Sequence, residues 1–336
     1  MATAGIGWYP SPGAVLASEF DLIRRYFTRH ASSAVLGVGD DCALLQPRPG
    51  MQLAVSSDML VEGQHFLRGT DPRRLGHKTL AVNLSDLAAM GADARWALLS
   101  IALPAADEAW IAAFSAGFFS LAQTFGVDLV GGDTTRGPLC LSVTVIGELP
   151  GGLALRRDGA RAGDDIWVSG STGEAALGLA HLQGRIRLPD ELAARCIDRL
   201  EVPQPRLELG GRLRGVASAA IDVSDGLLAD LGHVLEASDL GALIEFERIP
   251  RSGALNSCPD GELAEQCLLA GGDDYELLFA AASSRRDEIV AMGADLGVAV
   301  TRIGTAVDGA GKVRVVRADG TTVSPARTGF DHFSVD

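Results

Sequence analysis

Six short segments of this chain place an aspartate beside glycine or another small residue, and no other sequence feature constrains its fold and chemistry as strongly. The segments are Gly37–Ala43, Val55–Asp58, Asn83–Gly91, Gly131–Thr134, Ile221–Gly226 and Gly271–Tyr275. Aspartates held on tight, small-residue turns are the ligands that hard cations such as Mg²⁺ require. Six such segments predict more than one metal ion, and therefore a ligand as anionic as a nucleotide.

The length and the residue pattern predict a mixed α/β (α+β) fold in two domains. A chain of 336 residues is long for one domain. Asp71 and Pro72 are a helix cap and a first helical residue, so we expect a helix that ends near Gly91. β-Branched residues predict a strand over 139–149. Pro150–Gly152 then marks a boundary, which predicts domains at 1–149 and 150–336.

The sequence contains a weak internal repeat of two motifs. Ser-Asp86 precedes Gly-Gly-Asp133 at almost the same distance at which Ser-Asp225 precedes Gly-Gly-Asp273. Two halves of related topology would explain this spacing, and so would chance in a chain with 41 glycines.

Composition excludes several classes of protein. The formal charge of −14 disfavours nucleic acid as a partner, because phosphate backbones need a basic surface. No apolar run is long enough for a membrane span, and the first residues lack a signal-peptide pattern, so we expect a cytoplasmic protein with no membrane partner. The five cysteines are scattered without a C-x-x-C pair, which predicts reduced thiols.

Lysine occurs only at Lys78 and Lys312, and the chain has no G-x-x-x-x-G-K-[ST] segment. An ordinary P-loop is therefore excluded. The dinucleotide-binding G-x-G-x-x-G and the protein-kinase H-R-D and D-F-G motifs are also absent from the sequence. If the chain binds ATP, it does so with another architecture.

The excess of aspartates fits phosphoryl transfer between two anions better than acid–base catalysis. Transfer from ATP to a phosphate ester joins roughly four and two negative charges, and the ester is already ionised near neutral pH because its second pKa is about 6. The barrier is then charge repulsion, which metal ions bridging the phosphates reduce. Glycoside hydrolysis would need only one pair of carboxylates.

Single residues leave alternatives open. Asn83 and Asp86 share one face of an otherwise apolar helix, where Asp86 is either a capping or salt-bridge residue or a metal ligand facing a cleft. His65 is a substrate contact or a surface histidine. Arg156 and Arg157 are phosphate ligands or a solvated pair. The turn Gly170–Gly173 either opens an anion-binding helix N-terminus or is an ordinary turn.

Taken together, the motifs resemble those of the thiamine-monophosphate kinase family. These motifs are G-V-G-D-D-C-A-L-L, S-S-D-M-L-V-E-G-Q-H-F, K-T-L-A-V-N-L-S-D-L-A-A-M-G-A, G-G-D-T-T-R-G-P, A-I-D-V-S-D-G-L-L-A-D-L and G-G-D-D-Y-E-L-L. The resemblance runs from about Phe20 to Phe333. The wider group comprises the aminoimidazole ribonucleotide synthetase-like ATP-binding enzymes, including selenophosphate synthetase and a hydrogenase-maturation protein.

The resemblance implies phosphorylation of thiamine monophosphate by ATP and Mg²⁺, giving thiamine diphosphate. It implies aminoimidazole ribonucleotide synthetase-like N- and C-terminal domains with the active site in the cleft between them. The N-terminal domain would bind ATP and metal and pair in a homodimer, and several Mg²⁺ ions would bind per site, with K⁺ as a further candidate cation.

By the same resemblance, site residues fall into four groups. The metal ligands are Asp41, Ser56, Ser57, Asp58, Asp86, Asp133, Asp222 and Asp225, of which Asp86, Asp133 and Asp225 are the catalytic residues. The ATP contacts are Gly132, Asp133, Arg157 and Ser224. The substrate contacts are His65, Asp273 and Phe330, with Phe330 stacking on the thiamine rings and Asp273 offsetting the thiazolium charge.

One residue departs from the family pattern, and two other functions compete with the kinase. The family has Gly-Gly-Glu-Asp-Tyr-Glu where this chain has Asp273, one methylene shorter, so water-mediated contact with the substrate is expected. A selenophosphate synthetase-like enzyme would need a reactive cysteine near its N-terminus with a lysine close by, yet no cysteine precedes Cys42 and no lysine precedes Lys78. A non-catalytic ATP-binding scaffold of the same fold would not need the full set of carboxylates.

Overall fold

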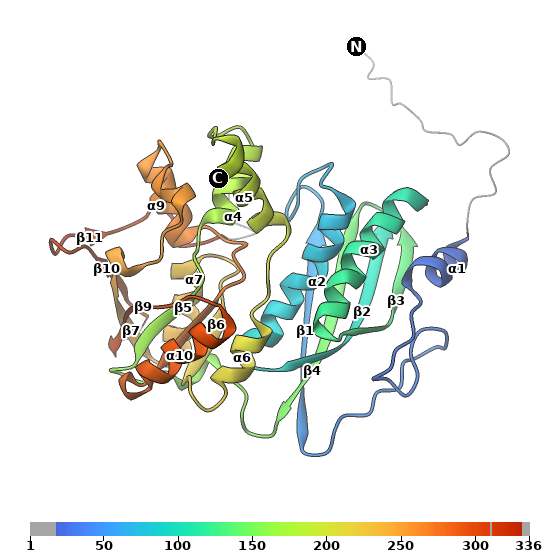
Figure 1. Cartoon of the computed structure of the whole chain (residues 1–336), viewed down its shortest axis with the longest axis horizontal. Helices are drawn as coiled ribbons and strands as arrows, with labels where there is room; N and C mark the ends of the chain where they lie inside the picture. Colours follow the sequence, from blue (N-terminus) through green and yellow to red (C-terminus); the bar gives the residue numbers. More distant parts are fainter. Residues whose placement is uncertain (1–17, 310, 331–336) are drawn as a thin grey trace, which may run out of the picture.

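The computed structural model describes residues 18–309 and 311–330, which form two α/β domains side by side (Figure 1). The first domain contains α1 (Glu19–Leu22), the π-helical turn η1 (Ile23–Phe27), β1 (Met51–Val61), α2 (Pro72–Ala89), β2 (Asp93–Leu103), α3 (Glu108–Phe125), β3 (Asp128–Arg136) and β4 (Cys140–Pro150). Residues 331–336, which include Phe333 at the end of the family resemblance, lie outside the described residues.

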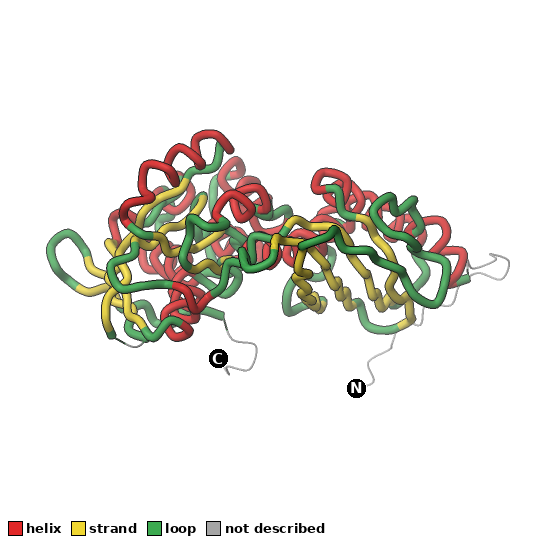
Figure 2. The backbone as a smooth tube through the Cα atoms, turned by 90° about the horizontal axis from the view of Figure 1, so that it is seen from below, coloured by secondary structure: helices red, strands yellow, loops and turns green. Residues whose placement is uncertain are grey.

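The first domain is a four-stranded sheet covered by helices on one face only. The strands lie in the order β1-β4-β2-β3, with β2 and β3 parallel and the other pairs antiparallel. Figure 2 shows the helices of this domain gathered on one side of its sheet. On the other face, β1 exposes 45% of Leu53, 63% of Val55 and 56% of Met59. We call this uncovered side the open face.

The second domain is built on a seven-stranded sheet in the order β11-β10-β7-β9-β5-β8-β6. Its strands are β5 (Asp165–Ser169), β6 (Ala219–Asp222), β7 (Leu240–Glu245), β8 (Leu277–Ala281), β9 (Val300–Asp308), β10 (Val313–Val316) and β11 (Thr322–Val323). Its helices are α4 (Glu174–Leu182), α5 (Asp190–Glu201), α6 (Leu207–Leu213), α7 (Leu227–Ala237), α8 (Gly253–Asn256), α9 (Gly261–Ala270) and α10 (Arg286–Leu296), with short 3₁₀ turns η2 (Arg157–Gly159), η3 (Phe246–Arg248) and η4 (Ser283–Arg285).

Helix α2 lies where the two domains meet, and α6 packs directly against it (Figure 1). A Cβ built on Gly210 of α6 would stand 2.0 Å from the backbone oxygen of Ala88, so only glycine permits this approach. Leu207 and Leu213 of α6 are buried in the same apolar cluster as the first domain's core. The domains therefore share one continuous core along α2.

Polar contacts reinforce this junction from the N-terminal half of α2. Arg74 binds Glu201 of α5 at 2.6 Å and also pairs with Asp198. One turn later, His77 Nε2 lies 2.8 Å from the carbonyl oxygen of Pro203. Since α2 supplies both the apolar and the polar contacts, its side chains are held in fixed positions relative to the second domain.

The predicted helices and strands are present, and Asp86 lies inside α2 as expected. The expectation that the aspartates sit on tight turns is wrong for Asp58, which lies inside β1, and for Asp133, which lies inside β3. At Gly132 the backbone φ is 143°, and a Cβ there would meet the oxygen of Leu99 at 1.8 Å. This glycine thus allows two neighbouring strands to approach rather than ending a strand.

The structure also settles two smaller expectations. The repeated motifs occupy different settings, since Asp86 lies in a helix whereas Asp225 lies in the turn between β6 and α7, so the spacing reflects no shared local structure. All five cysteines are free thiols, as predicted.

Across residues 18–309 and 311–330, we find no helix whose length and hydropathy would let it span a bilayer.

Candidate active site

A cavity of about 420 Å³ lies between the domains, and it contains most of the predicted site residues. Four aspartates line it, namely Asp58, Asp86, Asp222 and Asp225, which we call the cleft carboxylates. His65, Asp273, Tyr275 and Phe330 also line it, and we call them the aromatic group; Ser224 is a further lining residue. The cavity therefore combines a set of carboxylates with aromatic and imidazole side chains.

Each cleft carboxylate comes from a different position in the fold. Asp58 is in β1, and its backbone N–H donates to Asn83 Oδ1 of α2 at 2.9 Å. The hydroxyl of Ser56 donates to Asp86 at 2.5 Å. Asp222 ends β6, and Ser85 of α2 donates to it at 2.7 Å across the domain junction. The small polar residues around Asp86 thus align β1, α2 and β6.

Burial, together with mutual repulsion at Asp58 and Asp222, raises the pKa values of these carboxylates in the metal-free state. Burial, followed by the charges of Asp86 and Asp225, raises the pKa of Asp58 to about 6. Burial, with Asp86 as the next cause, raises the pKa of Asp222 to about 8. Burial also raises the pKa of Asp86, while Ser56 and Arg157 oppose the change. A group of like charges in one partly desolvated cleft favours a bound cation.

The donor set fits Mg²⁺, although its members stand apart from one another. Among the described residues, no three His, Cys, Asp or Glu side chains already form a metal-binding arrangement. Carboxylate and hydroxyl oxygens are the ligands that Mg²⁺ accepts, and Mg²⁺ commonly binds through one or two carboxylates plus phosphate oxygens. Asp58, Asp86, Asp222 and Asp225 offer such oxygens on both sides of the cleft.

A buried aspartate outside the predicted set shapes the turn before α7. The backbone N–H groups of Ser224, Asp225 and Gly226 donate to Asp230 Oδ2 at 3.0, 3.1 and 3.0 Å. Burial raises the pKa of Asp230 to about 7, whereas these three N–H groups lower it. Asp230 thereby fixes the turn that presents Ser224 and Asp225 to the cleft. The signal available in the sequence was the position of Asp230, an acidic residue in the first turn of α7.

The aromatic group is held by bonds from both domains. The N–H of Val61 donates to His65 Nδ1 at 3.0 Å, so in the neutral ring the proton is on Nε2. The hydroxyl of Tyr275 donates to Asp273 Oδ1 at 3.0 Å. The N–H of Phe330 donates to the carbonyl of Asp225 at 3.0 Å. Phe330 is 51% exposed, which leaves part of its ring available to a ligand.

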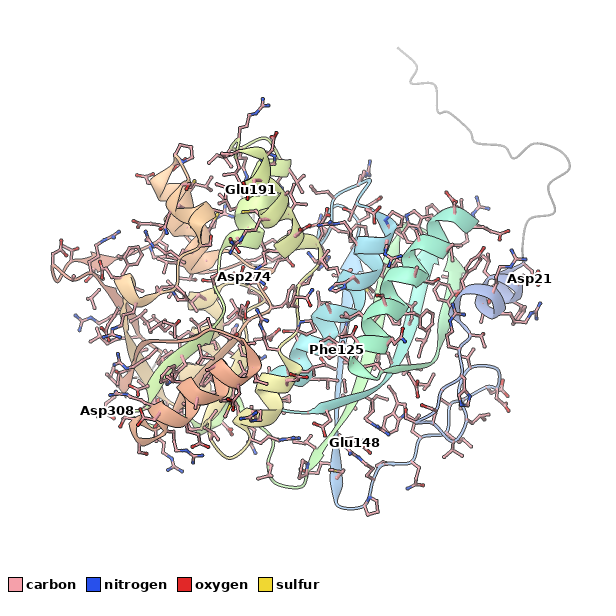
Figure 3. The ribbon with its side chains drawn as sticks, viewed as in Figure 1. Asp21, Phe125, Glu148, Glu191, Asp274 and Asp308 are labelled. Atoms are coloured by element: carbon pink, nitrogen blue, oxygen red, sulfur yellow. The ribbon has the colours of Figure 1, made fainter. Side chains whose placement is uncertain are left out.

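Two residues of the aromatic group adopt a backbone conformation that non-glycine residues rarely take. Asp273 has φ of 67° and Tyr275 has φ of 51°. Between them lies Asp274, labelled in Figure 3 at the base of α4, whose Oδ2 accepts the N–H of Gly173 at 2.8 Å. Burial raises the pKa of Asp274 well above its ordinary value. Local strain of this kind persists only where the surrounding contacts hold it.

Three predicted site residues lie away from the cleft. Asp133 and Gly132 are on β3, at the opposite edge of the sheet from β1, and three strand spacings separate these edges by about 14 Å. Asp133 pairs with Ser100, and both side chains are exposed on the open face. Asp41 is exposed in the segment before β1, which Ser33 attaches to Asp128 at the start of β3.

The remaining predicted residues are near the cleft. Ser57 lines the cavity from β1 and lies 2.9 Å from the hydroxyl of Thr144 on the open face. Arg157 is exposed in η2, close enough for its charge to lower the pKa of Asp86. Lys78 also lies near the cleft, where it is buried beside Asp273. The sequence had drawn attention to it only because lysine is rare in this chain. Its position in an apolar helix, eight residues before Asp86, was the available signal.

Family models match both halves of the chain. The AIR synthase related protein N-terminal domain matches residues 39–149, and the corresponding C-terminal domain matches residues 161–317. A thiamine-monophosphate kinase of Salmonella typhimurium is 46% identical over 321 residues, which cover 94% of this chain and 98% of the relative.

Solved structures give the same result. The crystal structure of thiamine-monophosphate kinase from Stenotrophomonas maltophilia is 48% identical, with a TM-score of 0.81 over 90% of this chain and 95% of that one. The structure of AaThiL complexed with AMPPCP and TMP is 30% identical, with a TM-score of 0.74 over 86% of this chain and 89% of that one.

Proposed function

The chain belongs to the thiamine-monophosphate kinase family, and on that premise we propose that it uses ATP to phosphorylate thiamine monophosphate. The products are thiamine diphosphate and ADP. The observation that carries this proposal is the cleft between the domains, which is lined both by four carboxylates and by His65, Asp273 and Phe330. A cationic, aromatic substrate with a phosphate tail matches that distribution of groups.

The cleft carboxylates, together with Ser56 and Ser57, would hold Mg²⁺ against the phosphates of both substrates. Bound Mg²⁺ supplies positive charge that offsets repulsion between the two anions. The raised pKa values of Asp58 and Asp222 support this role, because a cation relieves the repulsion that contributes to them. Asp86 and Asp225 are the catalytic carboxylates of the proposal, with Arg157 and Ser224 as ATP contacts.

The transfer needs no general base. An oxygen of the substrate phosphate, already ionised near neutral pH, forms a bond to the γ-phosphorus while the bond from that phosphorus to the β-phosphate oxygen breaks. ADP leaves with the electron pair of the broken bond, and no proton has to move in the transition state. The two phosphates need only be held in line, a role that we assign to the residues lining the cleft.

The aromatic group would bind the thiamine rings. Phe330 offers a half-exposed ring for stacking on the pyrimidine or thiazolium. His65 accepts the Val61 N–H on Nδ1, so its neutral form presents Nε2–H as a donor to the substrate. Asp273 adds an acceptor from the second domain.

A homodimer completes the site in this proposal. Asp133, Gly132 and Asp41 lie too far from the cleft of their own chain, but Asp133 shares the open face with exposed Leu53 and Val55. A second copy seated on the open face would cover these apolar side chains and bring its own Asp133 toward Ser57 and Asp58. Because ATP is the co-substrate, we place the protein in the cytoplasm.

The test is product formation by the purified chain with ATP, Mg²⁺ and thiamine monophosphate. We expect thiamine diphosphate and ADP in equal amounts, dependent on Mg²⁺, and replacing K⁺ by Na⁺ in the same assay measures any need for K⁺. Asp86→Asn, which keeps the size of the side chain, should lower kcat by about 100-fold or more at an unchanged melting temperature. ATP binding without thiamine diphosphate would favour a scaffold, and ATP consumption with selenide alone would favour a selenophosphate synthetase.

A further inference from the structure

One buried ammonium joins the predicted substrate contacts of the two domains. Lys78 Nζ lies 3.0 Å from Asp273 Oδ1 and 3.3 Å from the carbonyl oxygen of His65. Its side chain is only 3% exposed, and it lies on α2, which is packed against the second domain. The sequence motif around Lys78 predicted no role for it in binding or catalysis.

The Lys78 contact changes what Asp273 can do. Tyr275 and Lys78 both bind Oδ1 of Asp273, so one carboxylate oxygen receives two donors. Burial and the neighbouring Asp273 charge raise the pKa of Tyr275 well above its ordinary value, which keeps its hydroxyl protonated as a donor. The ammonium balances the carboxylate charge, so Asp273 offers the substrate an oriented Oδ2 acceptor rather than a net negative charge.

The strained backbone of Asp273 makes this support necessary. Its φ of 67° is held by a backbone bond from its N–H to the carbonyl of Ser224 at 2.8 Å and by the side-chain bond to Lys78. A carboxylate with one methylene fewer than glutamate reaches less far, so its position depends more on what anchors it. Lys78 supplies that anchor from the opposite domain.

The space around Lys78 explains why a lysine stands here in a chain that has only two lysines. The pocket that Lys78, Asp273 and His65 share has a volume of only about 70 Å³. A compact ammonium can point three donors into such a space, whereas a planar guanidinium requires a fixed fork of partners.

We propose that Lys78 is a positioning residue for the thiamine end of the substrate, fixing Asp273 and the backbone of His65 in one geometry across the domain junction. The proposal rests on the proposed function, since it concerns the binding of thiamine monophosphate. An opposing account makes Asp273 a counter-charge for the thiazolium, in which case the ammonium of Lys78 would weaken substrate binding.

Lys78→Met separates the two accounts, because methionine keeps the length of the side chain and removes the charge. Positioning predicts that KM for thiamine monophosphate rises about ten-fold or more, the cost of losing one charge-assisted hydrogen bond. KM for ATP and kcat should change by less than about three-fold. The lost contact concerns only thiamine monophosphate and is made equally in the ground state and the transition state. An unchanged or lowered KM for thiamine monophosphate overturns the proposal.

The effect must also pass through Asp273. In an Asp273→Ala background, Lys78→Met should raise KM for thiamine monophosphate little further, because the anchored group is already gone. A full additional ten-fold loss in that background would mean that Lys78 acts by general packing and would contradict positioning. Lys312→Met is the matched control, since the only other lysine of the chain is exposed and should give unchanged constants.

Lys78→Arg gives a second measurement if Lys78→Met does not fold. Arginine keeps the positive charge, but its planar fork does not reproduce the two contacts of the compact ammonium, so positioning predicts a raised KM for thiamine monophosphate with normal KM for ATP. The counter-charge account predicts a normal KM for both substrates. Failure of the wild-type chain to form thiamine diphosphate would instead reject the proposed function, so the two failures are distinguishable.

Discussion

Asp222 is the most deeply buried of the four cleft carboxylates, and it ties the electrostatics of the site to the stability of the chain. The hydroxyl of Ser85 donates to it at 2.7 Å, while Asp86, Asp230 and Asp58 all add like charge. A carboxylate in such surroundings favours its protonated form in the folded state. In the metal-free protein, the free energy of unfolding is therefore coupled to proton binding by the cleft carboxylates.

We predict that the metal-free protein loses stability as the pH rises from about 4 to 8. The folded-state pKa values of Asp58, about 6, and Asp222, about 8, exceed those of an unfolded aspartate. The folded chain thus binds more protons than the unfolded chain in that window, and the free energy of unfolding falls with rising pH. Thermal unfolding in a chelator at several pH values measures this slope.

Added Mg²⁺ should raise the melting temperature more at pH 8 than at pH 5, because the cation replaces the protons. Asp222→Asn is the control, since it removes one of the carboxylates whose pKa is raised and should make the metal-free pH slope less steep. A melting temperature that increases steadily from pH 5 to pH 8 in chelator would contradict the assigned burial of these carboxylates.

The types of the site residues could be predicted from the sequence, but their separation could not. The family resemblance predicts Asp58, Asp86, Asp222 and Asp225 as metal ligands, and these four side chains line one cleft. That Asp133 lies apart depends on strand order, because β3 neighbours β2 rather than β1. Residues that act through another side chain, such as Lys78 and Asp230, escaped notice because their partners come from other parts of the fold.

At the scale of elements, α2 organises both the cleft and the domain junction. Along its length it presents Lys78 to Asp273, Asn83 to the backbone of Asp58, and Ser85 to Asp222. Its bounds could be predicted from the cap at Asp71 and from Gly91, since local residues determine them. Its role as the junction could not be predicted, because its partner α6 belongs to the second domain and lies more than a hundred residues away in the sequence.

The close approach of α6 to α2 gives a stability prediction. Gly210→Ala should destabilise the protein by about 1–3 kcal/mol, because the added methyl group meets the oxygen of Ala88 and forces the helices apart. Denaturant unfolding measures the loss, and kcat should fall with it as the two sides of the cleft separate.

Gly211→Ala, at the next position of the same helix, is a matched control. A Cβ there stands 3.5 Å from the side chain of Arg214, an ordinary contact. Alanine in a helix should then add about 0.5–1 kcal/mol of stability. Equal effects of the two substitutions would show that α6 does not pack on α2 as described.

At the scale of the whole molecule, the four-stranded sheet of the first domain is covered by helices on one face, and its other face is uncovered. The open face carries exposed apolar residues of β1 together with Asp133 at the far edge. This arrangement accounts for the separation of Asp133 from the cleft if two chains share each active site.

A mixing experiment tests the shared site. Asp86→Asn and Asp133→Asn homodimers should each be inactive, but refolding an equal mixture of the two variants should restore about a quarter of the wild-type activity. Half of the dimers formed are then heterodimers, each with one site that carries neither substitution. Complete inactivity of a mixture shown to contain heterodimers would mean that each site is built within one chain.

The most direct test of phosphate-to-phosphate transfer in this cleft compares two acceptors, thiamine monophosphate and thiamine, in steady-state ADP release with the same Mg²⁺ and ATP. We predict that thiamine monophosphate supports turnover at least about 100-fold faster, because its phosphate is already ionised whereas a hydroxyl acceptor would need a general base. Equal rates with the two acceptors would contradict the conclusion that this cleft joins one phosphate to another.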